Sequence, residues 1–155
     1  MNARLLQDAL VEDIAELFKN RQYTSPHIEN ACLQVFSQNL PKRESEEDDD
    51  PFPYVIVRLD GGSIESQTAP YKVSVLLLVG IFDDDPANQG HRAVLEIFEE
   101  LQRHYEETPL VARQFIFDDP FEWALQDEES YPYFFGAARL SFKVTAPRRQ
   151  VSDLT

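Results

Sequence analysis

The sequence predicts an α+β fold, a mostly antiparallel sheet of four to five strands with two helices packed on one face. Two segments place apolar residues at helical spacing, and five others are rich in β-branched and aromatic residues. They follow one another as helix, three strands, helix and two strands, an order typical of helices layered on hairpin-connected strands. The 155 residues fit one domain, 1–146, followed by a flexible tail, 147–155.

The first helix is predicted over Ala3–Lys19, because five apolar residues recur there on one face: Leu6, Leu10, Ile14, Leu17 and Phe18. Ala31–Gln38 is the first candidate strand, with Leu33 and Val35 toward the core and Gln38 pointing away. The single cysteine, Cys32, falls in this strand and is expected to be a small buried thiol.

A flexible acidic loop, 42–52, is predicted next, because six of the seven residues from Glu44 to Asp50 are acidic and repel one another. The strand Tyr54–Leu59 follows and runs directly into a turn at DGG. The strand Tyr71–Phe82 alternates at first, but its second half is apolar on both faces. We therefore expect both faces to be covered there, by a helix or by another subunit.

The second helix is predicted to begin with Asp85 as N-cap and Pro86 at the first helical position, although Gly90 allows a start one turn later. Its buried stripe is expected to be Val94, Leu95, Phe98, Leu101 and Tyr105. Two strands follow, Val111–Phe117 and Ala137–Thr145. The alternation of the last one indicates an edge strand, or one with an exposed face that carries Arg139 and Lys143.

Nineteen residues, Asp118–Gly136, separate these two strands and are predicted to form a long aromatic loop. Phe121, Trp123, Tyr131 and Tyr133 are candidate interface residues, because such side chains often dominate protein–protein contacts. The alternative, that the rings only cover one end of the sheet, stays open.

No catalytic, metal-binding or cofactor-binding residues are predicted. The acidic run Asp83–Asp85 with His91 downstream is better explained by helix capping than by a metal site. Phosphate-binding and nucleophile-elbow motifs are absent. A net charge of −14 disfavours nucleic-acid and anionic-membrane partners, and the apolar run Val75–Val79 is too short to span a bilayer. We expect a soluble, non-enzymatic protein of a reducing compartment.

Several segments together resemble one family. They are SQNLP (Ser37–Pro41), PFPYVIVRLDGG (Pro51–Gly62), GIFDDDPANQGHRAVLEIFEEL (Gly80–Leu101), PFEW (Pro120–Trp123) and YPYFFGAARLSFKVTAP (Tyr131–Pro147). This pattern is similar to that of the tail-terminator and minor tail (head–tail joining) proteins of tailed bacteriophages and prophages. The resemblance implies a structural subunit without a cofactor, which forms a ring, usually a hexamer. Such a ring ends the tail tube and joins it to the head-completion or connector protein, first in the host cytoplasm and then in the virion.

Ring formation requires head-to-tail contacts that close. Candidates are the strand carrying Arg139 and Lys143, the aromatic loop, and the basic pair Arg148 and Arg149 of the tail. Two other classes remain open. One is an acidic DNA-mimic or regulatory binding protein, and the less favoured one is a metal-dependent hydrolase that uses Asp83–Asp85.

Overall fold

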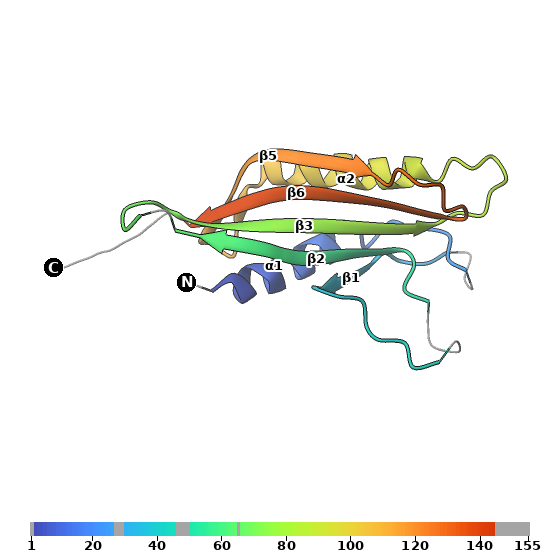
Figure 1. The fold of residues 1–155 in the computed structure, drawn as a ribbon, viewed down its shortest axis with the longest axis horizontal. Helices are drawn as coiled ribbons and strands as arrows, with labels where there is room; N and C mark the ends of the chain where they lie inside the picture. Colours follow the sequence, from blue (N-terminus) through green and yellow to red (C-terminus); the bar gives the residue numbers. More distant parts are fainter. Residues whose placement is uncertain (1, 27–29, 46–49, 65, 145–155) are drawn as a thin grey trace.

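The computed structural model describes residues 2–26, 30–45, 50–64 and 66–144. In these residues the chain forms two helices and six strands (Figure 1). Their bounds are α1 Ala3–Leu17, β1 Gln34–Ser37, β2 Tyr54–Ser63, β3 Tyr71–Phe82, α2 His91–Glu107, β4 Leu110–Val111, β5 Phe115–Leu125 and β6 Tyr133–Val144.

The strands form one mixed sheet in the order β1-β2-β3-β6-β5-β4. β1 runs parallel to β2, whereas all other neighbours are antiparallel. The protein is α+β, but the prediction of a mostly antiparallel sheet of four to five strands is wrong. The parallel pair arises because the connection from β1 to β2 carries the chain back to the end where β1 began. The sixth strand, β4, has two residues and is too short to produce a periodic signal.

Helix α1 is capped by Asn2, whose side-chain oxygen accepts a hydrogen bond from the Leu5 amide at 3.2 Å. Four residues of the predicted stripe are buried and Leu17 is half-buried, and the buried face also contains Gln7. The Gln7 amide donates to the Val57 carbonyl at 2.8 Å and to Gln38 Oε1 at 2.9 Å. These bonds satisfy a buried polar group and tie α1 to the edge of the sheet.

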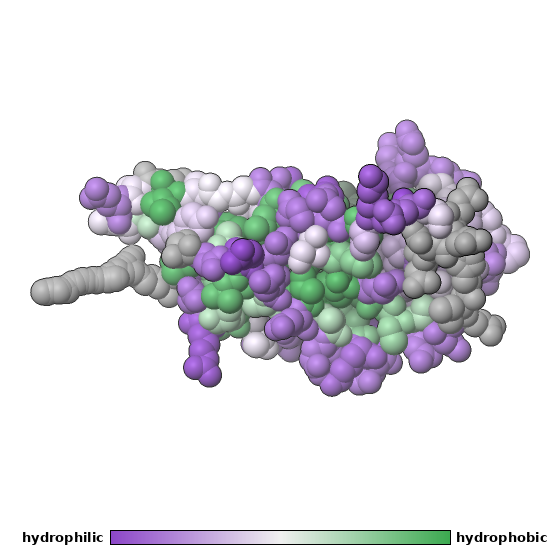
Figure 2. Space-filling model, turned by 90° about the horizontal axis from the view of Figure 1, so that it is seen from below, coloured by the Kyte–Doolittle hydropathy of each residue, from purple (hydrophilic) through white to green (hydrophobic). Residues whose placement is uncertain are grey.

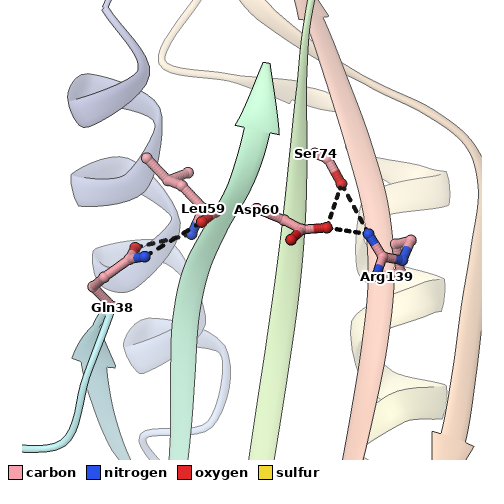
Figure 3. Close-up of polar contacts among 5 residues, drawn as sticks. All are labelled: Gln38, Leu59, Asp60, Ser74 and Arg139. Carbon is pink, nitrogen blue, oxygen red and sulfur yellow. Dashed lines mark hydrogen bonds and ion pairs between the residues drawn. The ribbon is translucent and has the colours of Figure 1, made fainter.

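β1 is shorter than the predicted strand and starts at Gln34. Cys32 precedes it and is exposed, so the expectation of a buried thiol is wrong. Gln38 follows β1 with a positive φ of 68°. Its side chain therefore turns back toward β2, where it exchanges hydrogen bonds with the Leu59 backbone at 3.0 and 3.3 Å instead of pointing away (Figure 3). Residues 46–49 of the predicted acidic loop lie outside the described residues.

β3 has the predicted bounds, and its odd-numbered residues from Val73 to Ile81 are buried beneath the helices. β2 extends beyond the predicted turn at DGG, because a shift in register between Leu59 and Gly61 absorbs the irregularity. Helix α2 begins at His91, later than the expected Asp85 cap. The Asp85 carboxylate instead accepts the Ala87 amide at 2.9 Å in the preceding turn.

The predicted long loop Asp118–Gly136 is wrong, because most of it belongs to β5 and β6. β6 is also not an edge strand, because it lies in the sheet between β3 and β5. The predicted strand Val111–Phe117 is divided between β4 and the first residues of β5, and the register explains why the rest of β5 was not predicted. Asp118 pairs with Ser141 and Glu122 with Arg139, so four residues of β5 span two of β6. Pro120 lies in this bulge, and a proline inside an apparent strand normally argues against one.

Both helices lie on one face of the sheet and share a single buried core with it, α1 against β1 and β2 and α2 against β3, β5 and β6. Figure 1 looks onto the other face, with the helices behind the strands. We call this surface the outer face. No described helix is long and apolar enough to cross a membrane.

Candidate interaction face

One half of the outer face is apolar. Alternation along the strands directs to this side the residues that the helices do not cover. They surround a shallow hollow of about 370 Å³, lined by Tyr54, Ile56, Leu78, Ala124, Phe135 and Ala137. Tyr54 and Ile56 form its buried floor, whereas Leu78 and Phe135 are half-buried and Ala124 is exposed. The hollow is therefore a preformed apolar surface with no described helix over it.

Aromatic rings border this hollow at the end where β2 begins. Phe52 packs against Tyr54 and Tyr133, with ring centroids 5.1 and 4.8 Å apart, and Tyr133 contacts Phe82 at 5.5 Å. Burial raises the pKa of the Tyr54 hydroxyl above its ordinary value. Gly80 lies beside the same ring, and a Cβ there would meet it at 2.3 Å. The cluster is thus close-packed and holds the hollow in shape.

The apolar surface continues to the β1 edge of the sheet. Phe36 is the register partner of Ile56 and lies half-buried on the outer face. Beyond it, Phe36, Leu40 and Pro51 line a second hollow of about 360 Å³ with Lys42 and Arg43 at its rim. Figure 2 views the molecule from this side and shows hydrophobic residues gathered centrally between hydrophilic ones. No described strand pairs with the free edge of β1.

The other half of the outer face is charged. Asp60, in the second half of β2, pairs with Arg139 of β6, and Ser74 lies between them on β3 (Figure 3). Nearby, Asp118 lies 3.3 Å from Lys72 and 3.6 Å from Lys143. Exposed pairs such as these contribute about 0–1 kcal/mol each to stability. Their main effect is to keep the surface locally balanced in a strongly acidic protein.

The helix side of the molecule is strongly acidic. α1 and α2 carry nine acids and three arginines, and the acids are Asp8, Glu12, Asp13, Glu16, Glu96, Glu99, Glu100, Glu106 and Glu107. Between the helices, Asp13 Oδ2 accepts a hydrogen bond from the Tyr105 hydroxyl at 2.9 Å and lies 2.9 Å from His104 Nε2. This contact joins the two helices at their solvent boundary.

The predicted interface residues do not form one surface. Tyr133, Arg139 and Lys143 lie on the outer face, where their register partners are Phe82, Leu76 and Lys72. Trp123 is half exposed but lies on the helix side, stacked on Phe98 at 6.1 Å.

Of the four remaining candidates, two lie elsewhere on the chain and two lie outside the described residues. Phe121 is half-buried against the core, in the bulge of β5. Tyr131 lies in the β5–β6 turn and donates its hydroxyl hydrogen to the Asp84 carbonyl at 2.5 Å. Arg148 and Arg149 lie outside the described residues.

Sequence reasoning missed the residues that line the apolar hollow. The available signal was the second half of β3, which is apolar on both faces and predicts a cover on both. The sequence did not show that Tyr54, Ile56 and Phe135 lie beside it on the outer face. That connection depends on strand order, since β2 and β6 flank β3 in the sheet.

The acidic run before α2 has a structural explanation. The Asp83 carboxylate accepts the Asp85 amide at 3.0 Å, so both Asp83 and Asp85 stabilise the turn. Within the described parts of the chain, no three His, Cys, Asp or Glu side chains come together in a way that could hold a metal ion.

Fold and surface define an α+β protein whose sheet has acidic helices on one side and an open, partly apolar face on the other. Comparison with known protein families gives no match, and no curated protein is similar in sequence. The fold is shared with a solved structure whose name states no function. That structure is 14% identical, with a TM-score of 0.60, and the alignment covers 96% of this chain and 99% of the other. This likeness concerns the fold alone.

Proposed function

We propose that the chain is a structural assembly subunit of a phage or prophage, and that its copies associate through the outer face. In the finer form of the proposal they form a ring that terminates a tail tube and joins it to the head connector. The observation that carries the proposal is the open apolar half of the outer face. The finer form rests on the resemblance of the sequence segments to tail-terminator proteins.

The proposal is supported by the unfavourable free energy of leaving this apolar surface in water. Contiguous apolar patches rimmed by charge are uncommon on monomeric proteins and mark sites of association. Leu78, Phe135 and Ala137 already sit around a fixed hollow, so little conformational freedom is lost when a partner covers them. Apolar burial then stabilises the contact by roughly 25 cal/mol per Å² of surface removed from water.

The first experiment is the solution mass, measured by light scattering over a wide range of protein concentration. We expect a closed, discrete oligomer of about six copies, and Leu78→Glu should shift it to monomer while leaving the thermal transition cooperative. Thr68→Glu, an exposed position in the β2–β3 hairpin, is the matched control. A wild-type monomer at every concentration that also fails to stop tail-tube polymerisation would contradict the proposal.

The second candidate function is that of a DNA mimic, and the acids of α1 and α2 favour it. Their carboxylates follow the two helices, as expected of a protein that imitates DNA. Such a protein would bind a basic DNA-handling partner with strong salt dependence. Reversal of the charges at Glu96 and Glu99 would abolish that binding, and Leu78→Glu would not. Because assembly requires the outer face and binding of a basic partner to the helices does not, Leu78→Glu separates the two functions.

A further inference from the structure

The two sides of the molecule differ in charge as well as in polarity, and the difference specifies how copies could meet. We infer that the contact between copies is heterologous: the outer face of one copy binds the acidic helix side of the next. This inference rests on the proposed function and adds to it the orientation of the subunits.

The outer face carries more cations than anions, although the chain has a net charge of −14. Alternation along β2, β3, β5 and β6 places four cations and three anions there: Arg58, Lys72, Arg139 and Lys143 against Asp60, Asp118 and Glu122. Asp118 is shared by two lysines. Among the described residues, Arg58 bonds neutral groups alone, the Gln38 carbonyl at 3.0 Å and Asn39 Oδ1 at 3.3 Å. This face therefore has positive charge available to a partner.

The helix side has negative charge available. Exposed Asp8, Glu12, Glu96 and Glu99 have no ion pair within the part of the chain that the structure describes. Lys19 pairs with Glu16, and Arg21 and Arg103 both pair with Glu100. Arg4 and Arg92 have no ion pair among the described residues, but the nine acids of the two helices still outnumber their three arginines. Two helix sides would repel each other, and each would be attracted to an outer face.

The helix side also offers an apolar counterpart to the apolar half of the outer face. Leu5 of α1 and Leu110 of β4 are 39% and 52% exposed, although both are large hydrophobic residues. Leu110 lines a hollow of about 410 Å³ between α1 and β4 together with Ala9 and Val111, and Glu12, Asp13 and Glu16 line the same hollow. Contact with an outer face would remove the apolar side chains from water and bring the cations of that face near these acids.

Two different contact surfaces favour a ring or a filament over a pair. An outer face bound to a second outer face would close at two copies and leave both acidic helix sides in solution. When the outer face binds the helix side, every copy uses two different surfaces, and the contacts form a ring if the rotation between copies closes and an open filament if it does not. The charge asymmetry therefore argues against a face-to-face pair without depending on the sequence resemblance.

The test uses two charge-reversed variants of the full chain. The face variant is Arg58→Glu with Lys143→Glu, and the helix variant is Asp8→Lys with Glu12→Lys. Each variant alone should need at least about tenfold more protein to assemble, measured by light scattering. An equal mixture should assemble like the wild type, since each contact then joins opposite charges. Neutral versions, Arg58→Gln and Asp8→Asn, should weaken assembly less and should not rescue each other.

The control is Asp127→Lys with Glu128→Lys in the β5–β6 turn, which changes the net charge as much as the helix variant does. It should assemble normally and should not rescue the face variant. Normal assembly of the helix variant would overturn the inferred orientation but leave an assembly subunit that pairs face to face. Equal rescue by the control would also overturn it, because total charge alone would then explain the mixture. A wild-type chain that neither assembles nor caps a tube would remove both the inference and the proposed function.

Discussion

Tyr105 shows how a single side chain links stability to pH in this protein. The ring is fully buried, and its hydroxyl reaches Asp13 on the other helix. Burial is the main cause that raises the pKa of Tyr105 well above its ordinary value of 10.0, and the negative charge of Asp13 adds to it. The folded protein therefore keeps the phenolic proton under conditions in which the unfolded chain loses it.

The expected consequence is a loss of stability in alkali. Below pH 10 both states hold the proton, and above it only the folded state does, so Tyr105 lowers the free energy of unfolding by about 1.4 kcal/mol per pH unit. Tyr105→Phe should cost about 1 kcal/mol at pH 7 through the lost hydrogen bond and should make the alkaline slope shallower. Urea unfolding at pH 7 to 11 measures both effects. An unchanged slope would mean that Tyr105 ionises in the folded state.

Arg113 is a second residue whose backbone conformation has a measurable cost. It lies in the β4–β5 turn with φ of 63°, and its neighbour Ala112 has φ of 52°. Left-handed conformations cost L-residues roughly 1–2 kcal/mol, and glycine avoids most of this cost. Arg113→Gly should therefore stabilise the protein by about 0.5–1 kcal/mol. Gln114→Gly, one residue further on and outside the positive-φ set, should destabilise it, and thermal melts of both variants decide the point.

Among the elements, those with long and regular patterns were predicted best. The stripe of α1 and the alternation of β3 each follow one period over many residues, and the structure bears out both. The predicted strand Val111–Phe117 covers only the start of β5, because the bulge around Pro120 interrupts the period and Glu122 and Trp123 then resemble loop residues. A local pattern cannot reveal a strand whose regularity depends on its neighbour.

The packing of α2 on β6 gives a test at the same scale. At Gly136 an added Cβ would lie 2.8 Å from Val94 and 2.9 Å from Phe98, both on α2. Gly136→Ala should therefore push the helix away from the sheet and destabilise the protein by about 1–3 kcal/mol. Val94→Ala in the same background should cost less than the two single changes added together, as measured by chemical denaturation. If the effects of the two changes on the free energy of unfolding simply add, the close approach of Gly136 to Val94 is contradicted.

The candidate site could be predicted only in outline. Apolar residues on both faces of β3 indicated a covered surface, but the partners of β3 were not visible in the sequence. The outer face is assembled from Phe52, Tyr54 and Phe135, which are far apart in the chain and meet because β2 and β6 flank β3. The aromatic side chains that stood out in the sequence, Trp123 among them, were instead divided between the two sides of the sheet.

At the scale of the whole molecule, the chain order and the spatial order of the strands differ. β6 lies at the centre of the sheet, pairing with β3 from Tyr71↔Val144 to Phe82↔Tyr133. The α+β class follows from the sequence of helices and strands, but the central place of β6 does not, since several strand orders satisfy the same local patterns.

Removal of β6 should therefore have a larger effect than removal of an edge strand. A chain ending at residue 130 would leave β3 and β5 without their shared neighbour, and we expect it to show no cooperative thermal transition by circular dichroism. A chain ending at residue 144 keeps every described strand and should unfold cooperatively. Cooperative unfolding of the shorter chain would show that β1, β2 and β3 with the helices form an independent unit.

The central position of β6 also bears on how the protein is made in the cell. During translation, β3 and β5 leave the ribosome with their facing edges unpaired, and they stay so until β6 emerges. Neighbouring nascent chains on one polysome would therefore present open edges to each other before they present finished surfaces. Late insertion of β6 would remove these edges at the moment when the outer face becomes complete, so that the strands would be paired before the proposed contact between copies could form.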